Sequence, residues 1–278
     1  MVVTEIFRSI QGEGTRAGLP CVFVRLTGCN LRCVWCDTAY AFHGGKKKTI
    51  EEVMEEVRAL AAVPNGDGLQ GLKPQSSGPS KSELKLRPPT DMDRLEPATA
   101  GRLRPPKDAS QAGSRAIDLI EITGGEPLLQ PEAAPLAAKL LEEGYTVMIE
   151  TSGERYVGPE ASGLPRKVIK IMDVKCPDSG EFGKFDMRNL DAIDGKDEIK
   201  FVLASRRDFE FARDFTREHR LAERVRQVIF SPVHPDPQGG WPGLDSRALA
   251  KWILEEGLPV RLGLQLHKFI WPADMRGV

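Results

Sequence analysis

Three of the five cysteines in this sequence fall in one short segment, at the spacing Cys-x3-Cys-x2-Cys. They are Cys29, Cys33 and Cys36. Three thiolates on one loop can bind three corners of a [4Fe–4S] cluster, which usually takes four cysteines. The missing fourth ligand would leave one iron open to a small molecule, much as a catalytic metal keeps one position that a structural metal fills. The segment therefore predicts a reactive iron–sulfur centre.

Two simpler roles of these cysteines, structural zinc binding and disulfide formation, are alternatives to a cluster. Structural zinc takes four nitrogen or sulfur ligands in closely spaced pairs, and His43 is the nearest candidate for a fourth ligand. The second ligand pair of a zinc finger is absent, however, and this spacing of the cysteines is unusual for one. Nothing else in the chain resembles a secreted protein, which makes a disulfide the weaker alternative.

The composition is that of an ordinary globular protein. Hydrophobic residues make up 40% and charged residues 28% of the 278 positions, which suffices for one large domain with a sizeable core. The formal net charge of −1 gives no general attraction to nucleic acids or anionic membranes. No apolar run approaches a membrane span, and the first residues lack the regions of a signal peptide. We therefore expect a cytoplasmic enzyme with a single domain, residues 1–278, and no nucleic-acid or membrane partner.

Strand and helix patterns alternate along most of the chain. Residues 4–14 read as a short extended segment that ends in a glycine-bracketed turn. Residues 20–26 are β-branched and aromatic, which predicts a first strand that leads into the cysteine segment. Thr49 and Glu52 form a capping-box pattern, which predicts a helix over 49–61.

A second series of elements follows residue 116. Residues 117–123 predict a strand that leads directly into Gly124-Gly125-Glu126-Pro127. The later elements share the same alternation: expected strands at 146–150, 168–174, 198–203, 225–230 and 260–265, and expected helices at 132–143, 207–219 and 246–256. The helix at 132–143 ends at Gly144, a common terminator.

Residues 65–115 differ from the rest. Gly, Pro, Ser, Lys and Arg dominate there, and aromatic residues and apolar periodicity disappear. Such a segment buries too little apolar surface to order itself. We expect a low-complexity, largely disordered insertion within the single domain, and a solvated linker rather than a partner-binding surface.

The alternation predicts an α/β fold made of parallel strand–helix units, arranged as an incomplete parallel (β/α) barrel. Several connections are too short for full helices, so the helical layer should be reduced. The loops after the strands, at 151–153, 173–175 and 231–233, should then meet at one rim together with the cysteine segment.

The cysteine spacing, with an aromatic residue (Trp35) before the third cysteine, resembles the radical S-adenosylmethionine (SAM) superfamily. The loop Gly124-Gly125-Glu126-Pro127 after a strand resembles the superfamily's loop for the SAM amino group, and Glu126 is suited to accept hydrogen bonds from an ammonium. This likeness implies a [4Fe–4S] cluster whose open iron is chelated by SAM, and cleavage of SAM to a 5′-deoxyadenosyl radical.

Further segments resemble the 7-carboxy-7-deazaguanine synthase family. They are residues 5–14, 18–20, 23–26, 36–38, 150–153, 173–175 and 264–268. The likeness spans the chain except 65–115. It implies a carbon–nitrogen lyase that converts 6-carboxy-5,6,7,8-tetrahydropterin to 7-carboxy-7-deazaguanine with loss of ammonia, in the biosynthesis of queuosine and other 7-deazapurines. It also implies Mg2+ as a cofactor, a homodimer, and a flavodoxin- or ferredoxin-type electron donor.

The same resemblance implies roles for particular residues, with no catalytic residue beyond the cofactor ligands. Cys29, Cys33 and Cys36 would bind the cluster and Thr38 would contact Mg2+. Predicted SAM contacts are Trp35, Cys36, Asp37, Gly125, Glu126, Asp173, Val174 and Lys175, with Ser152 and Ser231 as looser candidates. Predicted substrate contacts are Ile10, Gln11, Gly12, Arg25, Thr123, His267 and Val278. Arg25 suits a carboxylate, whereas His267 is equally compatible with a structural role.

Two other functions are compatible with parts of this pattern. A glycyl-radical activase also carries the three-cysteine spacing, but it must admit a protein loop and has no need of Arg25 or Thr38. A non-catalytic metal- or RNA-binding protein of tRNA modification is disfavoured by the near-neutral charge and the few aromatic residues.

Overall fold

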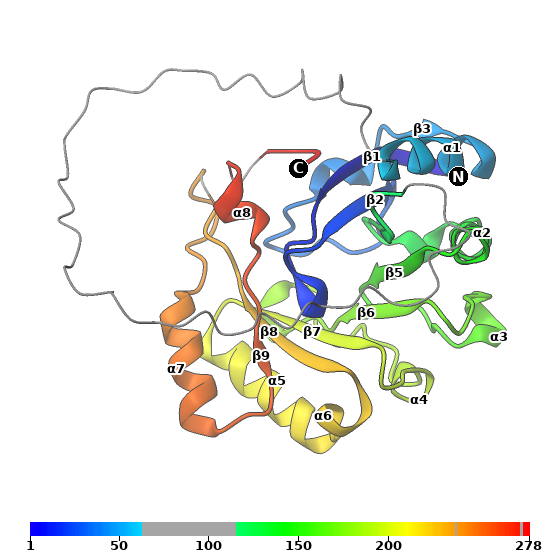
Figure 1. The fold of residues 1–278 in the computed structure, drawn as a ribbon. Helices are drawn as coiled ribbons and strands as arrows, with labels where there is room; N and C mark the ends of the chain where they lie inside the picture. Colours follow the sequence, from blue (N-terminus) through cyan, green and yellow to red (C-terminus); the bar gives the residue numbers. More distant parts are fainter. Residues whose placement is uncertain (63–114, 237, 273–274) are drawn as a thin grey trace, which may run out of the picture. The chain divides into compact units, whose positions relative to one another are not determined.

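The computed structural model of the chain describes residues 1–62, 115–236, 238–272 and 275–278. Within these ranges, nine strands form one sheet in the order β3-β1-β2-β4-β5-β6-β7-β8-β9 (Figure 1). The strands are β1 Val2–Ile10, β2 Pro20–Leu26, β3 Lys46–Lys47, β4 Leu119–Gly124, β5 Thr146–Thr151, β6 Ile169–Asp173, β7 Glu198–Leu203, β8 Gln227–Pro232 and β9 Arg261–Leu262. The edge strands β3 and β9 do not pair with each other, so the barrel is incomplete, as predicted.

The pairing from β2 through β9 is parallel, whereas β1 pairs antiparallel with both β2 and β3. The prediction that residues 20–26 form the first strand is therefore wrong, because β1 precedes them and is a full strand. The connection from β1 to β2, residues 11–19, is too short for the crossover that parallel strands need. It forms a tight return that includes the 3₁₀ turn Gly14–Arg16.

Within the described residues, eight α-helices accompany this sheet, and the longer ones cover its outer face (Figure 1). They are α1 Ile50–Ala61, α2 Ala133–Glu142, α3 Pro159–Ser162, α4 Asn189–Ala192, α5 Arg206–Glu218, α6 Leu221–Arg224, α7 Ser246–Glu256 and α8 His267–Ile270. The predicted helices at 49–61, 132–143, 207–219 and 246–256 are confirmed within a residue at each end. The one-turn helices α3, α4, α6 and α8 were not predicted, since they are too short to show periodicity.

The capping box of α1 is present as the sequence indicates. The Thr49 side chain accepts a hydrogen bond from the Glu52 backbone N–H at 3.2 Å, and the Glu52 carboxylate accepts one from the Thr49 N–H at 2.7 Å. These two bonds satisfy backbone donors that the helix leaves unpaired at its start. Gly144 follows α2 with φ +83°, the left-handed conformation that favours glycine.

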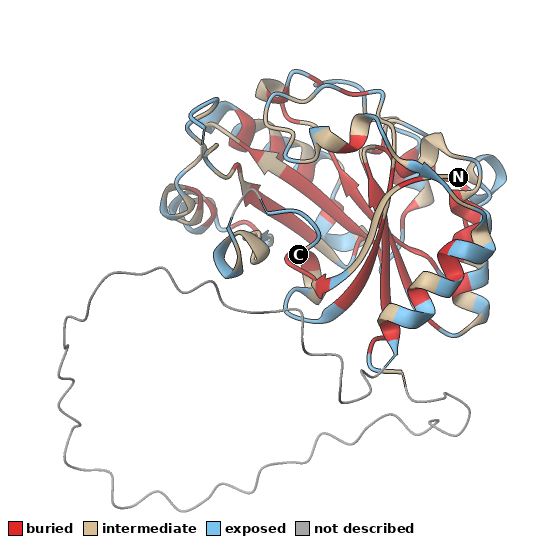
Figure 2. Cartoon of the chain, turned by 90° about the horizontal axis from the view of Figure 1, so that it is seen from above, coloured by how far each residue is buried: buried red, intermediate tan, exposed pale blue. Residues whose placement is uncertain are grey.

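Three apolar clusters build the interior, and burial is concentrated along the strands (Figure 2). One packs α1 and α2 against the outer face of β2, β4 and β5. A second packs α5, α6 and α7 against the outer face of β6, β7 and β8. The third lies inside the barrel and contains Cys21, Phe23, Leu119, Met148, Ile169 and Ile171. This internal plug closes one end of the barrel and leaves the other end for a site.

The strand predicted at 260–265 is reduced to the two residues of β9. Beyond it the chain leaves the sheet and crosses the barrel mouth, where the Leu266 N–H donates to the Gly12 carbonyl at 3.0 Å. Residues 1–62 and 116–278 form one compact unit. Apart from Arg115, the insertion expected at 65–115 lies outside the described residues. In the described part of the chain, no helix is long and apolar enough to cross a membrane.

Candidate active site

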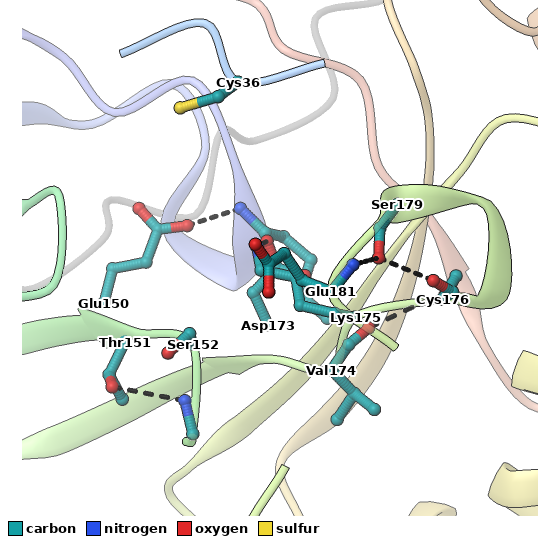
Figure 3. Close-up of polar contacts among 12 residues, drawn as sticks. Cys36, Glu150, Thr151, Ser152, Asp173, Val174, Lys175, Cys176, Ser179 and Glu181 are labelled. Atoms are coloured by element: carbon teal, nitrogen blue, oxygen red, sulfur yellow. Dashed lines mark hydrogen bonds and ion pairs between the residues drawn. The ribbon is translucent and has the colours of Figure 1, made fainter. Parts of the chain in front are cut away.

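A cavity of about 420 Å³ opens at the end of the barrel where the parallel strands finish. Its wall combines the cysteine segment, the turn after β1, the strand ends and the C-terminal segment. Figure 3 shows Cys36 on its loop above the strand ends that carry Glu150, Asp173 and Lys175. The loops after β5 and β6 thus meet the cysteine segment at one rim, as the alternation predicts.

The three clustered cysteines all line this cavity as free thiols. Burial raises the pKa of Cys29, and it raises the pKa of Cys33 to about 11. The Leu31 backbone N–H donates to Cys29 Sγ at 3.4 Å, a contact that stabilises a thiolate. Soft thiolates at the wall of a partly buried cavity suit iron–sulfur ligation.

No three His, Cys, Asp or Glu side chains among the described residues are arranged to hold a single metal ion. A cubane cluster differs, because it presents separate iron atoms to separate thiolates. Three thiolates on one loop therefore suit three irons of such a cluster.

The loop after β4 packs directly against the cysteine segment. The Glu126 backbone N–H donates to the Gly28 carbonyl at 2.8 Å. A Cβ atom on Gly125 would collide with that carbonyl and lie 2.6 Å from the Cys29 Cβ. Only glycine permits this approach. The two motifs therefore form one continuous rim, although about ninety residues of sequence separate them.

The side chain of Glu126 forms hydrogen bonds with neighbouring loops of the chain. Its carboxylate accepts hydrogen bonds from the Leu128 N–H (3.1 Å) and Thr151 Oγ1 (2.8 Å), and from Ser152 through its N–H (2.8 Å) and its Oγ (2.7 Å). It is fully buried and does not line the cavity. Donors of the chain itself occupy both oxygens in this structure, and the expected hydrogen bond from a SAM ammonium stays a prediction. Glu126 ties the loop after β4 to the loop after β5.

Asp173 and Lys175 form an ion pair of 2.7 Å at the end of β6. Burial alone would lower the pKa of Lys175, but Asp173 and the Cys33 sulfur nearby raise it overall. Asp173 Oδ1 is buried and has no hydrogen-bond partner among the described residues. The pair therefore offers one acceptor atom and one cation to a ligand beside the cysteines.

Arg25 projects from β2 into the cavity, where its Nε donates to Glu5 Oε1 at 2.9 Å. The Tyr40 hydroxyl donates to the same oxygen at 2.8 Å. Within the described residues no group accepts a hydrogen bond from the terminal nitrogens of Arg25. The charge is thus paired through one edge of the guanidinium, and the other edge can take an anionic group.

The polar floor of the cavity consists of charged side chains that sequence reasoning missed. Lys200 on β7 donates to Glu13 Oε2 at 2.8 Å and also pairs with Glu150 on β5. Glu121 on β4 lies beside them and accepts a hydrogen bond from Gln11 Nε2. The available signal was a charge at an inward position of an otherwise apolar strand, as in Ile-Glu-Ile and Ile-Lys-Phe. Such charges are costly inside a barrel unless they are paired or bind a ligand.

The C-terminal segment closes one side of the site. Gln265 Nε2 donates to Glu13 Oε1 at 2.8 Å and to Asp37 Oδ2 at 3.3 Å, and Lys268 Nζ contacts Asp37 Oδ2 at 2.8 Å. His267 lies against Gly12, and burial lowers its pKa. Gln265 and Lys268 were also missed, although they lie within a segment that sequence analysis singled out.

Most predicted site residues meet at this cavity. Those that line it are Ile10, Gln11, Gly12, Arg25, Cys29, Cys33, Trp35, Cys36, Asp37, Thr38, Thr123, Gly125, Ser152, Asp173, Lys175, His267 and Val278. Three predicted SAM contacts do not line it: Glu126, Val174 and Ser231, all of which are buried behind the wall.

A partial parallel barrel with three free cysteines and a Gly-Gly-Glu-Pro loop at its mouth is the architecture of a radical SAM enzyme. Comparisons with known proteins show to which family of this class the chain belongs. The chain is 44% identical to the 7-carboxy-7-deazaguanine synthase of Koribacter versatilis, with both chains covered completely. It is 32% identical to that of Chlorobaculum tepidum, over 99% of this chain and 96% of the relative. The protein belongs to the 7-carboxy-7-deazaguanine synthase family.

The fold comparison agrees with this assignment. The crystal structure of QueE from Escherichia coli matches 95% of this chain and 93% of its own, with a TM-score of 0.59 and 19% identity. At that identity the match concerns the fold alone. A search against models of protein families found no match.

Proposed function

We propose that this protein is a radical SAM lyase that converts 6-carboxy-5,6,7,8-tetrahydropterin to 7-carboxy-7-deazaguanine with release of ammonia. The observation that carries the proposal is the 44% identity over the whole length of a relative of that name. The cavity agrees with it, because the three thiols, a half-paired Arg25 and a group of charged side chains all line it.

In this proposal Cys29, Cys33 and Cys36 hold a [4Fe–4S] cluster, and SAM lies between the cysteine segment and the loops after β4, β5 and β6. When bound, these two groups supply the reductive cleavage of SAM that starts the reaction. The chain positions them: Glu126 fixes the Ser152 loop, and Asp173 with Lys175 offers an acceptor and a cation. Binding and exclusion of water are the protein's part, since the cofactors carry the difficult chemistry.

We further propose that the substrate carboxylate binds the open edge of Arg25, with a Mg2+ ion held against it by Thr38. The nearest polar partner of the Thr38 hydroxyl is Cys36 Sγ at 3.8 Å, which leaves its oxygen available. One protein ligand is compatible with Mg2+, which commonly keeps water and takes substrate oxygens. Ile10, Gln11, Gly12 and Thr123, with His267 and Val278, complete the pocket for the heterocycle.

Residues 1–62 and 116–278, as one compact unit, support a single catalytic domain in which residues 65–115 are inserted. We also propose a homodimer located in the cytoplasm, with a flavodoxin- or ferredoxin-type protein as electron donor. Size-exclusion chromatography with light scattering tests the homodimer.

The decisive experiment supplies anaerobic, cluster-reconstituted protein with the tetrahydropterin, SAM, Mg2+ and a reductant, and detects 7-carboxy-7-deazaguanine by mass. We expect product from the unmodified protein, none from Cys33→Ala, and a reduced rate from Thr38→Ala. Cys176→Ala is the matched control, because that cysteine is buried and does not line the cavity. Cleavage of SAM with the pterin untouched would contradict the substrate assignment and favour another radical enzyme, such as an activase.

A further inference from the structure

Glu121 is a buried polar residue of the cavity floor. Alternate residues of β4 face inward, and Leu119 belongs to the internal plug while Glu121 and Thr123 line the cavity. The neighbours of Glu121 in the sheet register are Phe23 on β2 and Met148 on β5. Two apolar residues therefore flank Glu121 in the sheet, and Glu121 is 3% exposed.

The carboxyl group of Glu121 accepts one hydrogen bond, and a second contact fixes the orientation of its donor. The Glu13 backbone N–H donates to Gln11 Oε1 at 2.9 Å, which fixes the orientation of the Gln11 amide. Gln11 Nε2 then points at Glu121 Oε2 and donates to it. Within the described residues, Glu121 Oε1 makes no hydrogen bond. One oxygen is thus an occupied acceptor, and the other is available at the cavity floor.

Among the described residues, neither of the two nearby cations forms an ion pair with Glu121. Lys200 pairs with Glu13 and Glu150, and Arg25 pairs with Glu5. Burial raises the pKa of Glu121 well above its ordinary range, and the charges of Glu150 and Glu13 raise it further. A buried carboxyl group that has no ion-pair partner and lies beside two other carboxyl groups favours its neutral form. Because Oε2 accepts from Gln11, the proton belongs on Oε1.

We propose that Glu121 binds the heterocyclic substrate as a neutral acid, with its Oε1–H donating a hydrogen bond to a carbonyl oxygen or an unprotonated ring nitrogen. This inference rests on the proposed function. It adds Glu121 to the substrate-binding residues, as a hydrogen-bond donor to an acceptor atom of the ring. A site built to pair such an atom discriminates against a ring that lacks it, because the buried O–H would then be left without a partner.

Binding of unreactive 6-carboxypterin to the anaerobic, cluster-loaded enzyme tests the proposal. Glu121→Met keeps the side-chain length among apolar neighbours but removes the donor, and we expect the Kd to rise about 10-fold or more. Glu121→Gln keeps one donor and one acceptor, and its Kd should stay within about threefold of the unmodified enzyme. Iron content and SAM binding of both variants should be unchanged, which shows that the site is assembled.

Infrared spectra give an independent readout, because a protonated carboxyl group has a carbonyl band that an ionised one lacks. We expect Glu121→Gln to remove such a band and Asp118→Asn, an exposed change just before β4, to remove none.

Two outcomes would overturn the inference. Equal weakening by glutamine and methionine would mean that the ionised carboxylate binds the ring, and unaltered binding by both would mean that Glu121 does not contact it. The unmodified enzyme is assayed first, so a failure to form product is recognised separately as a failure of the proposed function. Lack of pterin binding by that enzyme would overturn both.

Discussion

Replacing Lys268 by methionine tests how the C-terminal segment is held across the mouth of the barrel. In this segment, Lys268 and Gln265 both contact the Asp37 carboxylate, and Gln265 also donates to Glu13. The Leu266 N–H donates to a backbone carbonyl. Methionine keeps most of the aliphatic stem, which is largely buried, and removes only the ammonium.

The expected magnitude follows from the exposure of the ion pair. The Lys268 side chain is 9% exposed but that of Asp37 is 42% exposed, and a pair this accessible contributes at most about 1 kcal/mol. That energy corresponds to a roughly fivefold change in a local opening equilibrium. Burial opposes ionisation of Asp37, but Lys268 and Arg25 lower its pKa overall. The contribution is therefore complete at neutral pH and is lost as the pH falls through that lowered pKa.

Amide hydrogen exchange measures this opening directly. We expect the Leu266 amide to exchange about fivefold faster in Lys268→Met, with no change at the amides of β7. Lys251→Met is the matched control, because it removes an exposed ion pair with Glu255 on α7. An unaltered rate at Leu266 would refute the reasoning, and so would a uniform acceleration across the sheet, which would indicate global destabilisation instead.

Three further changes test other parts of the structure. Glu126→Gln places an amide N–H₂ against backbone and hydroxyl donors, so we expect about 2 kcal/mol lower stability in urea and weaker SAM binding by equilibrium dialysis. Thr49→Ala removes the capping box and should cost about 1 kcal/mol in the same denaturation, with SAM binding unaltered. Because the pKa of Glu121 is raised on folding, the folded protein loses stability as the pH rises above the ordinary carboxyl range. The stability advantage of Glu121→Gln should consequently grow as the pH rises above about 5, and an advantage that shrinks would contradict the assignment.

The sequence by itself determined the local elements and the chemistry of the rim. The bounds of β2, β7 and α7 match the predicted ones, and the capping box of Thr49 forms as expected. These signals are short in range, because β-branched runs, caps and glycine stops act through neighbouring residues. The cysteine spacing is equally local, since three ligands within one loop need no distant partner.

Only the tertiary structure decided which polar side chains from distant segments of the chain contact one another. Glu126 was expected to contact a ligand, and its carboxylate also accepts hydrogen bonds from the loop after β5. Lys200 and Glu121 stand in strands far apart in the chain, and nothing near either of them shows that both lie on one cavity floor. The antiparallel start of the sheet likewise depends on how β1 meets β2. Such outcomes follow from the packing of the barrel, which brings inward-facing residues of separate strands within a few ångströms of one another.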